Sequence, residues 1–448
     1  MCHCSKSVHQ GQNDRLGIKT KSSPTPKEEA QQKQVLRALR RERFELSRIA
    51  RGIFAKQGEK EGKKHVLNYH RSAKCAYIAI GEVAINKSIE YEKAFFTGIM
   101  TCGSVWACPN CAAKVQERRR AEISTAMDHM YQNGRKAVMV TLTFPHTMRN
   151  NLKGLLDAQK EAFKLLRKGR SWDLFKGREG YAGLIRSLEV TFGENGWHPH
   201  THELWFVDST ANAEYMKSFI LRQWESACIR AGLLDPSKPA KLRAFRKHSV
   251  DVKDNCSTSD YLAKQDDSRN WGVDREIAKA SSKKGKKAGM HPFGFLTKYN
   301  EERNSIWARR WIEYNDAIKG KAQLFWSRGL KDLCGLNDVS DEELAVMSED
   351  EATEIMKLTQ PQWSKIANSN TQALVLDTAE ETSNKQVIEA VIENSSTTKK
   401  DVVTLIRKRM QLQDKLFSQN LTNGDMEEHE HHIRYNALSD EELNSFVN

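Results

Sequence analysis

The segment that most constrains the fold runs from Gly183 to Val207 and reads GLIRSLEVTFGENGWHPHTHELWFV. Two runs of aliphatic, aromatic and β-branched residues flank a Gly-Glu-Asn-Gly turn, and an Asn-Gly pair between such runs is a strong signal for a β-hairpin. Alternate residues of a strand point to the same face of the sheet, so His198, His200 and His202 place three imidazoles on one face. The segment therefore predicts a rigid hairpin with a histidine row on its second strand.

A carboxylate on the first strand faces this histidine row. A two-residue loop of Asn195 and Gly196 would place Glu189 opposite His202, whereas a four-residue loop would place it opposite His200. Two imidazoles and a carboxylate suit a catalytic divalent metal ion that keeps open coordination positions. The first histidine of the row is either a further ligand or a cap of the strand.

A second group of metal-binding side chains comes from cysteines. The stretch at 101–120 reads TCGSVWACPNCAAKVQERRR, and its Cys-Pro-Asn-Cys knuckle can grip one tetrahedral zinc ion through two thiolates. His70 is an alternative fourth ligand, and the simpler interpretation is a buried cysteine pair in an apolar turn. The predicted structural zinc ligands are Cys75, Cys102, Cys108 and Cys111.

The distribution of charge points to a polyanionic partner. Residues 340–448 carry 10 Lys and Arg against 21 Asp and Glu, a net charge of −11, whereas the whole chain carries +13. The preceding 339 residues therefore carry +24, which favours binding to nucleic acid. The acidic end is interpreted as a separate module or tail.

Basic side chains that could contact DNA phosphates gather in three stretches. They are an amphipathic helix expected at about 28–55, the helix after the cysteine knuckle, and a basic loop at 279–289. A solvated basic face is the alternative for the first helix, and a solvated loop is the alternative for 279–289. The predicted DNA-binding residues are Arg118, Arg119, Arg120, Lys283, Lys284, Lys286 and Lys287.

The order of elements predicts an α+β fold with an antiparallel sheet. The expected elements are a strand at 136–144, a helix at 151–176, the hairpin, a helix at 213–231 and a strand at 249–253. The aromatic stretch at 307–326 is also expected to be helical. The expected division of the chain is a basic, partly disordered N-terminal segment with an amphipathic helix (1–65), a Cys-rich zinc-binding segment (66–125), a domain with the predicted sheet and the histidine row (126–336) and an acidic C-terminal region of unknown role (337–448).

Several motifs in the same order resemble a known superfamily. VTLTF, WHPHTHELWFV and DYLAK are similar to the three motifs of rolling-circle replication initiators of the HUH endonuclease superfamily. CGSVWACPNCAAK, NGWHPHTH and KAQLFWSRGLK more closely resemble the Rep family of small bacterial plasmids, from about Cys75 to Leu336. The resemblance implies that residues 126–336 form an HUH-type endonuclease and origin-binding domain, with a central antiparallel sheet flanked by helices, that nicks one strand of origin DNA.

The resemblance also assigns roles to particular residues. His200 and His202 match the paired metal ligands of the family, Glu189 is the expected third ligand, and His198 is left open. Magnesium or manganese is the expected ion at this site. Tyr261 matches the nucleophile that would form a 5′-phosphotyrosine and release a 3′-OH primer.

Lys264 matches the lysine that accompanies the nucleophilic tyrosine. One position departs from the family pattern, because Ser257 stands where some members carry a glutamate that activates water at termination. Asp254 or Asp260 could take over that role, or termination could proceed differently.

The expected partners are the single-stranded or cruciform origin DNA of a plasmid and the host helicase and polymerase, and a homodimer is compatible with the sequence. A partner helicase is needed because the sequence has no phosphate-binding loop of the GxxxxGK[ST] type. No apolar run reaches transmembrane length, so we expect no membrane partner and a cytoplasmic location in a prokaryote. The alternatives are an HUH relaxase or transposase, and a zinc-containing DNA-binding regulator without catalytic activity. A binuclear metallohydrolase fits less well, because Glu203 and Leu204 follow the histidines where Asp-His is usual.

Overall fold

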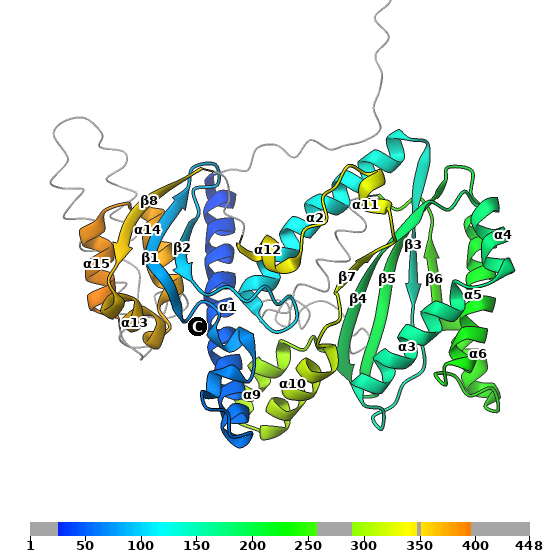
Figure 1. The fold of residues 1–448 in the computed structure, drawn as a ribbon, viewed down its shortest axis with the longest axis horizontal. Helices are drawn as coiled ribbons and strands as arrows, with labels where there is room; N and C mark the ends of the chain where they lie inside the picture. The colour runs from blue at the N-terminus through cyan, green and yellow to red at the C-terminus, as the bar shows by residue number, and fades with distance from the viewer. Residues whose placement is uncertain (1–25, 258–288, 347–350, 396–448) are drawn as a thin grey trace, which may run out of the picture.

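The computed structural model describes residues 26–257, 289–346 and 351–395, which form two antiparallel sheets and the helices around them (Figure 1). The larger sheet has five strands in the order β6-β3-β5-β4-β7, and the smaller has three in the order β2-β1-β8. The strands are β1 (Ala79–Ser88), β2 (Ala94–Ile99), β3 (Arg135–Leu142), β4 (Gly183–Gly193), β5 (Gly196–Asp208), β6 (Val250–Lys253), β7 (Leu324–Trp326) and β8 (Ala352–Leu358).

Helices account for much of the rest of the described chain, so the predicted α+β class is confirmed. The helices before the hairpin are α1 (Pro26–Lys60), the 3-10 helices η1 (Val66–Asn68) and η2 (Arg71–Lys74), α2 (Pro109–Gln132), α3 (Leu152–Leu166) and α4 (Arg170–Arg178). Those after it are α5 (Ala213–Arg230), α6 (Pro239–His248), α9 (Gly294–Glu302), α10 (Ser305–Ile318), α11 (Leu330–Leu333), α12 (Asp341–Val346), α13 (Gln360–Ser369), α14 (Gln372–Glu381) and α15 (Lys385–Glu393).

The five-stranded sheet is covered on both faces, because side chains of β5 alternate between two apolar clusters. Trp205 packs in the cluster that includes Trp224 of α5, whereas Leu204 and Phe206 pack in the cluster that includes Met127 of α2. The histidine row shares the α2 face. It lies nearer the β4–β5 turn, where the histidine side chains are only partly buried.

The three-stranded sheet joins distant parts of the chain. Strand β8, from the acidic end, pairs antiparallel with β1 and leaves β2 on the other side. One face of this sheet packs on α13, α14 and α15 in a cluster that also includes Phe44 of α1. Arg40 of α1 adds an ion pair to the buried Asp377 of α14, at 2.7 Å.

The helix expected at 151–176 is two helices. It breaks at Gly169, whose φ of +86° does not suit a side-chain-bearing residue in a helix. The expected helix at 307–326 is also partly wrong, because α10 ends at Ile318 and Leu324–Trp326 form the edge strand β7 against β4. The helix expected at 213–231 and the strands expected at 136–144 and 249–253 are confirmed. None of the helices in the described ranges has the length and apolar character needed to cross a membrane.

Candidate metal centres

Strands β4 and β5 form the predicted hairpin, and their register decides which histidine faces the carboxylate. Gly193 pairs with Gly196 across a turn of Glu194 and Asn195, and Glu189 pairs with His200. The pairing of Glu189 with His200 is the one predicted for a four-residue loop, although only Glu194 and Asn195 lie between the paired glycines. Gly196 takes φ +83°, and a Cβ there would lie 2.9 Å from the backbone of residue 148, so glycine fits both the turn and the close contact.

The carboxylate and two of the imidazoles converge on one point. Glu189 Oε2 lies 2.9 Å from His200 Nε2 and 3.7 Å from His202 Nε2. Two ligands at right angles, each about 2.1 Å from an ion, are about 3 Å apart, so these atoms fit a divalent cation with further positions open. Glu189, His200 and His202 are therefore able to hold a metal ion, and His198 is not part of this group.

Hydrogen bonds from β3 fix the orientation of the histidine rings. Thr141 Oγ1 lies 2.9 Å from His202 Nδ1, which leaves Nε2 of that ring directed at the carboxylate. Thr143 Oγ1 lies 2.6 Å from His198 Nε2, so His198 is engaged away from the metal-binding group. The predicted strand at 136–144 contains both threonines, and its alternation could have placed them beside the histidines, although neither is among the predicted site residues.

The protonation of these groups suits metal binding. Burial raises the pKa of Glu189, but the hydrogen bonds with His200 and His202 outweigh burial and hold that pKa well below its usual range. Burial, together with the neighbouring His200 and His146, lowers the pKa of His198 to about 3. His146 stacks on His198 at 4.6 Å, and His198 stacks on His200 at 4.7 Å. The carboxylate is therefore ionised and His198 is neutral at pH 7.

The second group able to hold a metal ion is formed by the four predicted cysteines. Their sulfur atoms all lie within 4.8 Å of one another, and Cys111 Sγ is 3.4 Å from Cys75 Sγ and 3.7 Å from Cys102 Sγ. Ligands of tetrahedral zinc with Zn–S bonds of about 2.3 Å lie about 3.8 Å apart, so the spacing fits zinc. Hydrogen bonds among the buried thiols hold the pKa of Cys111 well below its usual range and the pKa values of Cys102 and Cys108 well above it; a metal ion at their centre would favour the thiolate form of all of them.

His70, the alternative fourth ligand, has another role. Its Nδ1 accepts a hydrogen bond from the Ser72 amide and caps the 3-10 helix η2. Its ring stacks on Phe54 of α1 with a centroid distance of 4.7 Å. The metal-binding group is thus made of cysteines alone.

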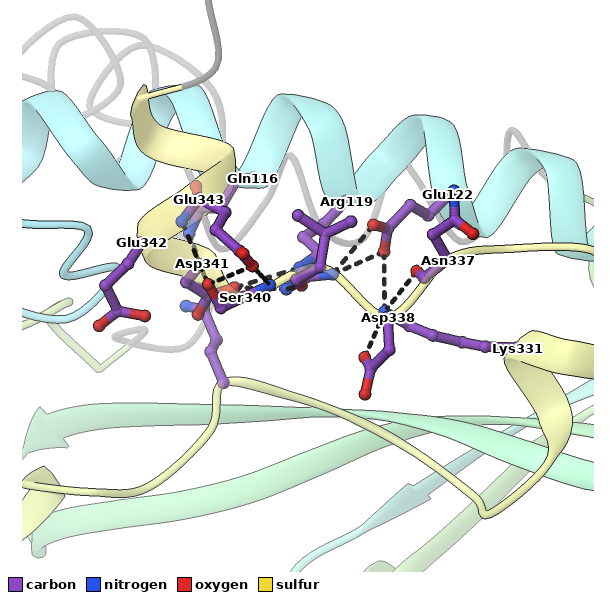
Figure 2. Close-up of polar contacts among 12 residues, drawn as sticks. Gln116, Arg119, Glu122, Lys331, Asn337, Asp338, Ser340, Asp341, Glu342 and Glu343 are labelled. Atoms are coloured by element: carbon purple, nitrogen blue, oxygen red, sulfur yellow. Dashed lines mark hydrogen bonds and ion pairs between the residues drawn. The ribbon is translucent and has the colours of Figure 1, made fainter.

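Two of the predicted DNA-binding arginines of α2 contact α12 or the segment before it, and Figure 2 shows the contacts of Arg119. Arg119 binds Glu122 at 2.8 Å, Asp341 at 2.8 Å and the Val339 carbonyl at 2.7 Å, and Arg118 donates to the Leu344 carbonyl. Contacts within the protein therefore engage both side chains.

A neighbouring lysine extends this network. Lys331 of α11 lies 3.1 Å from Asp338 and 3.8 Å from Glu122 (Figure 2). Arg120 is partly buried on the same helix. DNA binding by Arg118, Arg119 and Arg120 stays a prediction.

Other predicted site residues lie outside the described residues. They are Tyr261, Lys264, Lys283, Lys284, Lys286 and Lys287.

The family assignment follows from the sequence pattern of the replication protein family, which matches residues 95–373, more than half of the chain. This chain belongs to the replication protein family. The matched range contains Glu189, His200, His202 and three of the four clustered cysteines, whereas Cys75 precedes it.

Two relatives come from Streptomyces. Protein rep of Streptomyces lividans is 27% identical over 298 residues, which are 54% of this chain and 65% of that protein. A neomycin resistance protein of Streptomyces cyanogenus is 31% identical over 170 residues, 30% of this chain and 39% of that protein. The chain therefore matches less than two thirds of the length of either relative. No solved structure matches the chain.

Proposed function

We propose that this replication protein initiates rolling-circle replication of a plasmid by nicking one strand of the origin, as a member of the HUH endonuclease superfamily. The observation that carries the proposal is the convergence of Glu189, His200 and His202 on a partly open face of a rigid hairpin. Such a set leaves positions for a phosphate oxygen and suits phosphodiester cleavage. Membership of the replication protein family supports DNA as the substrate.

In the proposed reaction, the hydroxyl oxygen of Tyr261 attacks the scissile phosphorus in line with the leaving 3′ oxygen. The tyrosine–phosphorus bond forms, the bond from phosphorus to the 3′ oxygen breaks, the phenol gives up its proton to solvent, and the 3′ oxygen takes up a proton from solvent. A phenol has a pKa near 10 and needs activation, which we assign to Lys264. A divalent cation held by Glu189, His200 and His202 would supply Lewis-acid neutralisation of the non-bridging oxygens.

The position of the chain just after β6 is compatible with this role for Tyr261. The amide of Cys256 donates to the Ala137 carbonyl at 2.9 Å, so the chain is still beside β3 five residues before the tyrosine. Five residues span at most about 18 Å. Ala137 lies four residues before Thr141, about 13 Å along the strand. Chain length therefore allows position 261 to reach the histidine face.

The cysteine group has a structural role in this proposal. Four thiolates fill the coordination sphere of zinc and leave no position for a substrate. Magnesium or manganese at the hairpin and zinc at the cysteines would be the two cofactors. Single-stranded or cruciform origin DNA would be the substrate, and the host helicase and polymerase would extend the 3′-OH.

The test is covalent capture of DNA. Purified protein is incubated with manganese and a single-stranded oligonucleotide carrying the plasmid origin, and the linked peptide is identified by mass spectrometry. We expect an adduct on Tyr261, no adduct with Tyr261→Phe, and a normal adduct with the control Tyr215→Phe of α5. An adduct that persists in Tyr261→Phe would remove this residue from the mechanism. No adduct with any variant would favour the regulator without catalytic activity.

A further inference from the structure

Helix α6 carries an unusual concentration of positive charge. It reads PAKLRAFRKH, with five basic or titratable residues and no carboxylate in the helix. Phe245 is buried against the protein and Leu242 is partly buried, whereas the rest of the helix is exposed. The helix is thus attached along one side and presents the other to solvent.

The exposed side of α6 centres on Arg243 and Lys247. These positions are one turn apart and each lies about 160° around the helix from Phe245, because successive residues turn by about 100°. Neither side chain forms an ion pair or a hydrogen bond with any residue in the described ranges. Arg246, by contrast, is held by two bonds of 2.6 Å to Glu225 of α5.

Two of the other exposed positions on α6 are small, whereas Lys241, Arg246 and His248 carry longer exposed side chains. Ala240 and Ala244 flank the two cations, so the backbone of a polymer could approach this face closely. No large exposed apolar side chain occurs on α6, whereas stable protein–protein interfaces rely on buried aromatic and aliphatic anchors. This composition fits a polyanion better than a protein surface.

The C-terminal end of α6 meets the β6 edge of the sheet at the level of the histidines, whereas Phe245 packs with the apolar cluster on the opposite face. Ser249, the next residue, accepts a hydrogen bond through its carbonyl from the Thr143 amide at 2.9 Å, and Thr143 in turn contacts His198. Strand β6, which follows α6, is separated from the histidine-bearing β5 by β3, so the two strands lie two spacings of about 4.8 Å apart. Figure 1 shows α6 beyond β6 at this side of the sheet.

We infer that the outer face of α6, defined by Arg243 and Lys247, binds the phosphates of the DNA that flanks the cleavage site. The inference rests on the proposed function for the identity of the polyanion. This contact surface lies at the β6 edge of the five-stranded sheet, whereas β7 forms the other edge, next to β4. Phosphate contacts of this kind position the DNA without reading its sequence.

The test measures binding and its dependence on salt. The variant is Arg243→Glu/Lys247→Glu, with Arg243→Gln/Lys247→Gln as a milder second variant. The control is Lys168→Glu/Arg170→Glu, which reverses the same number of exposed charges around the start of α4. The probe is a fluorescent junction of duplex and single strand of mixed sequence, titrated by anisotropy at several salt concentrations.

All proteins in this test carry Tyr261→Phe, so that binding is measured without cleavage. Each lost phosphate contact reduces the slope of log affinity against log salt by about 1, so the glutamate and glutamine variants should lose about 2 in slope. The control should keep the slope of the parent. Equal slopes in the α6 variants and the parent would overturn the inference.

Two further measurements separate a fault in the fold or in the proposed function from a fault in the inference. Manganese affinity, measured by calorimetry, should be the same in the α6 variants and the parent, which shows that the hairpin is intact. A parent protein that binds the junction while the version with Tyr261 forms no covalent adduct contradicts the proposed function. In that case a loss of slope in the α6 variants still supports the phosphate-binding face.

Discussion

The two groups able to hold metal ions differ in exposure and in ligand type. The four cysteine residues are 1–3% exposed, whereas the side chains of Glu189, His200 and His202 are 15–17% exposed. Structural zinc sites are closed by four protein ligands, and catalytic sites keep a position open. The closed cysteine group would therefore suit a metal with a structural role, and the partly exposed group would suit one that accepts a substrate.

The two groups also differ in how the chain assembles them. Glu189, His200 and His202 lie on one hairpin whose strand pairing places them without a metal. The cysteines come from three separate places, the end of η2, the loop after β2 and the start of α2. Metal removal should consequently affect folding at the cysteine group and activity at the hairpin group.

The largest effect is expected from Cys111→Ser. Cys111 has sulfur neighbours at 3.4 and 3.7 Å, and loss of one thiolate from a closed zinc site removes binding energy that is also folding energy. We expect loss of about one zinc per chain and several kcal/mol of stability, measured by metal analysis and thermal unfolding. The control Cys228→Ser changes a buried cysteine outside the group, so this variant should keep the zinc content of the wild type. Full zinc content in Cys111→Ser would contradict the assignment.

The opposite pattern is expected at the hairpin. His202→Ala should reduce metal-dependent cleavage of origin DNA by about 10³-fold, since Lewis-acid assistance contributes several kcal/mol. Its unfolding temperature without metal should stay close to that of the wild type. His198→Gln serves as the control, because His198 is outside the metal-binding group. A large loss of stability without metal in His202→Ala would make the hairpin group structural and erase the contrast.

The contrast was partly predictable from sequence. The alternation of side chains on β5 predicts that the histidines lie on one face, and the short turn brings Glu189 of β4 beside them. The sequence allows two registers between these strands, and the backbone conformation at Gly196 determines which one forms. The pairing of β8 with β1 could not be predicted, because it joins segments more than two hundred residues apart. The spacing of the aromatic residues predicts a helix at Phe325 and Trp326, whereas pairing with β4 determines their conformation.

A smaller effect is expected from Thr141→Val, which removes the hydrogen bond to His202 Nδ1 and keeps the shape of the side chain. Loss of a group that orients a ligand typically weakens metal binding by about 10–100-fold. Calorimetry with manganese should show this loss, and Thr141→Ser should restore most of the affinity because it keeps the hydroxyl. Zinc content should not change in either variant. Equal manganese affinities for Val and Ser would leave Thr141 with a packing role only.

The smallest effect concerns pH and the surroundings of the cysteine group. Burial, with the nearby cations of Arg71 and Lys319, lowers the pKa of His70 to about 4, below its ordinary value of 6.5. The unfolded chain therefore binds a proton more readily than the folded protein. The stability contributed by neutral His70 is fully present above pH 6.5 and is lost as the pH falls from 6.5 towards 4.

The variant His70→Asn isolates this contribution. Asparagine keeps an acceptor for the amide of Ser72 but does not titrate. Thermal unfolding between pH 7 and 5, with zinc content measured in parallel, should show a smaller decrease in stability for the variant than for the wild type. The same decrease in both proteins, at equal zinc content, would show that the loss of stability in acid does not come from His70.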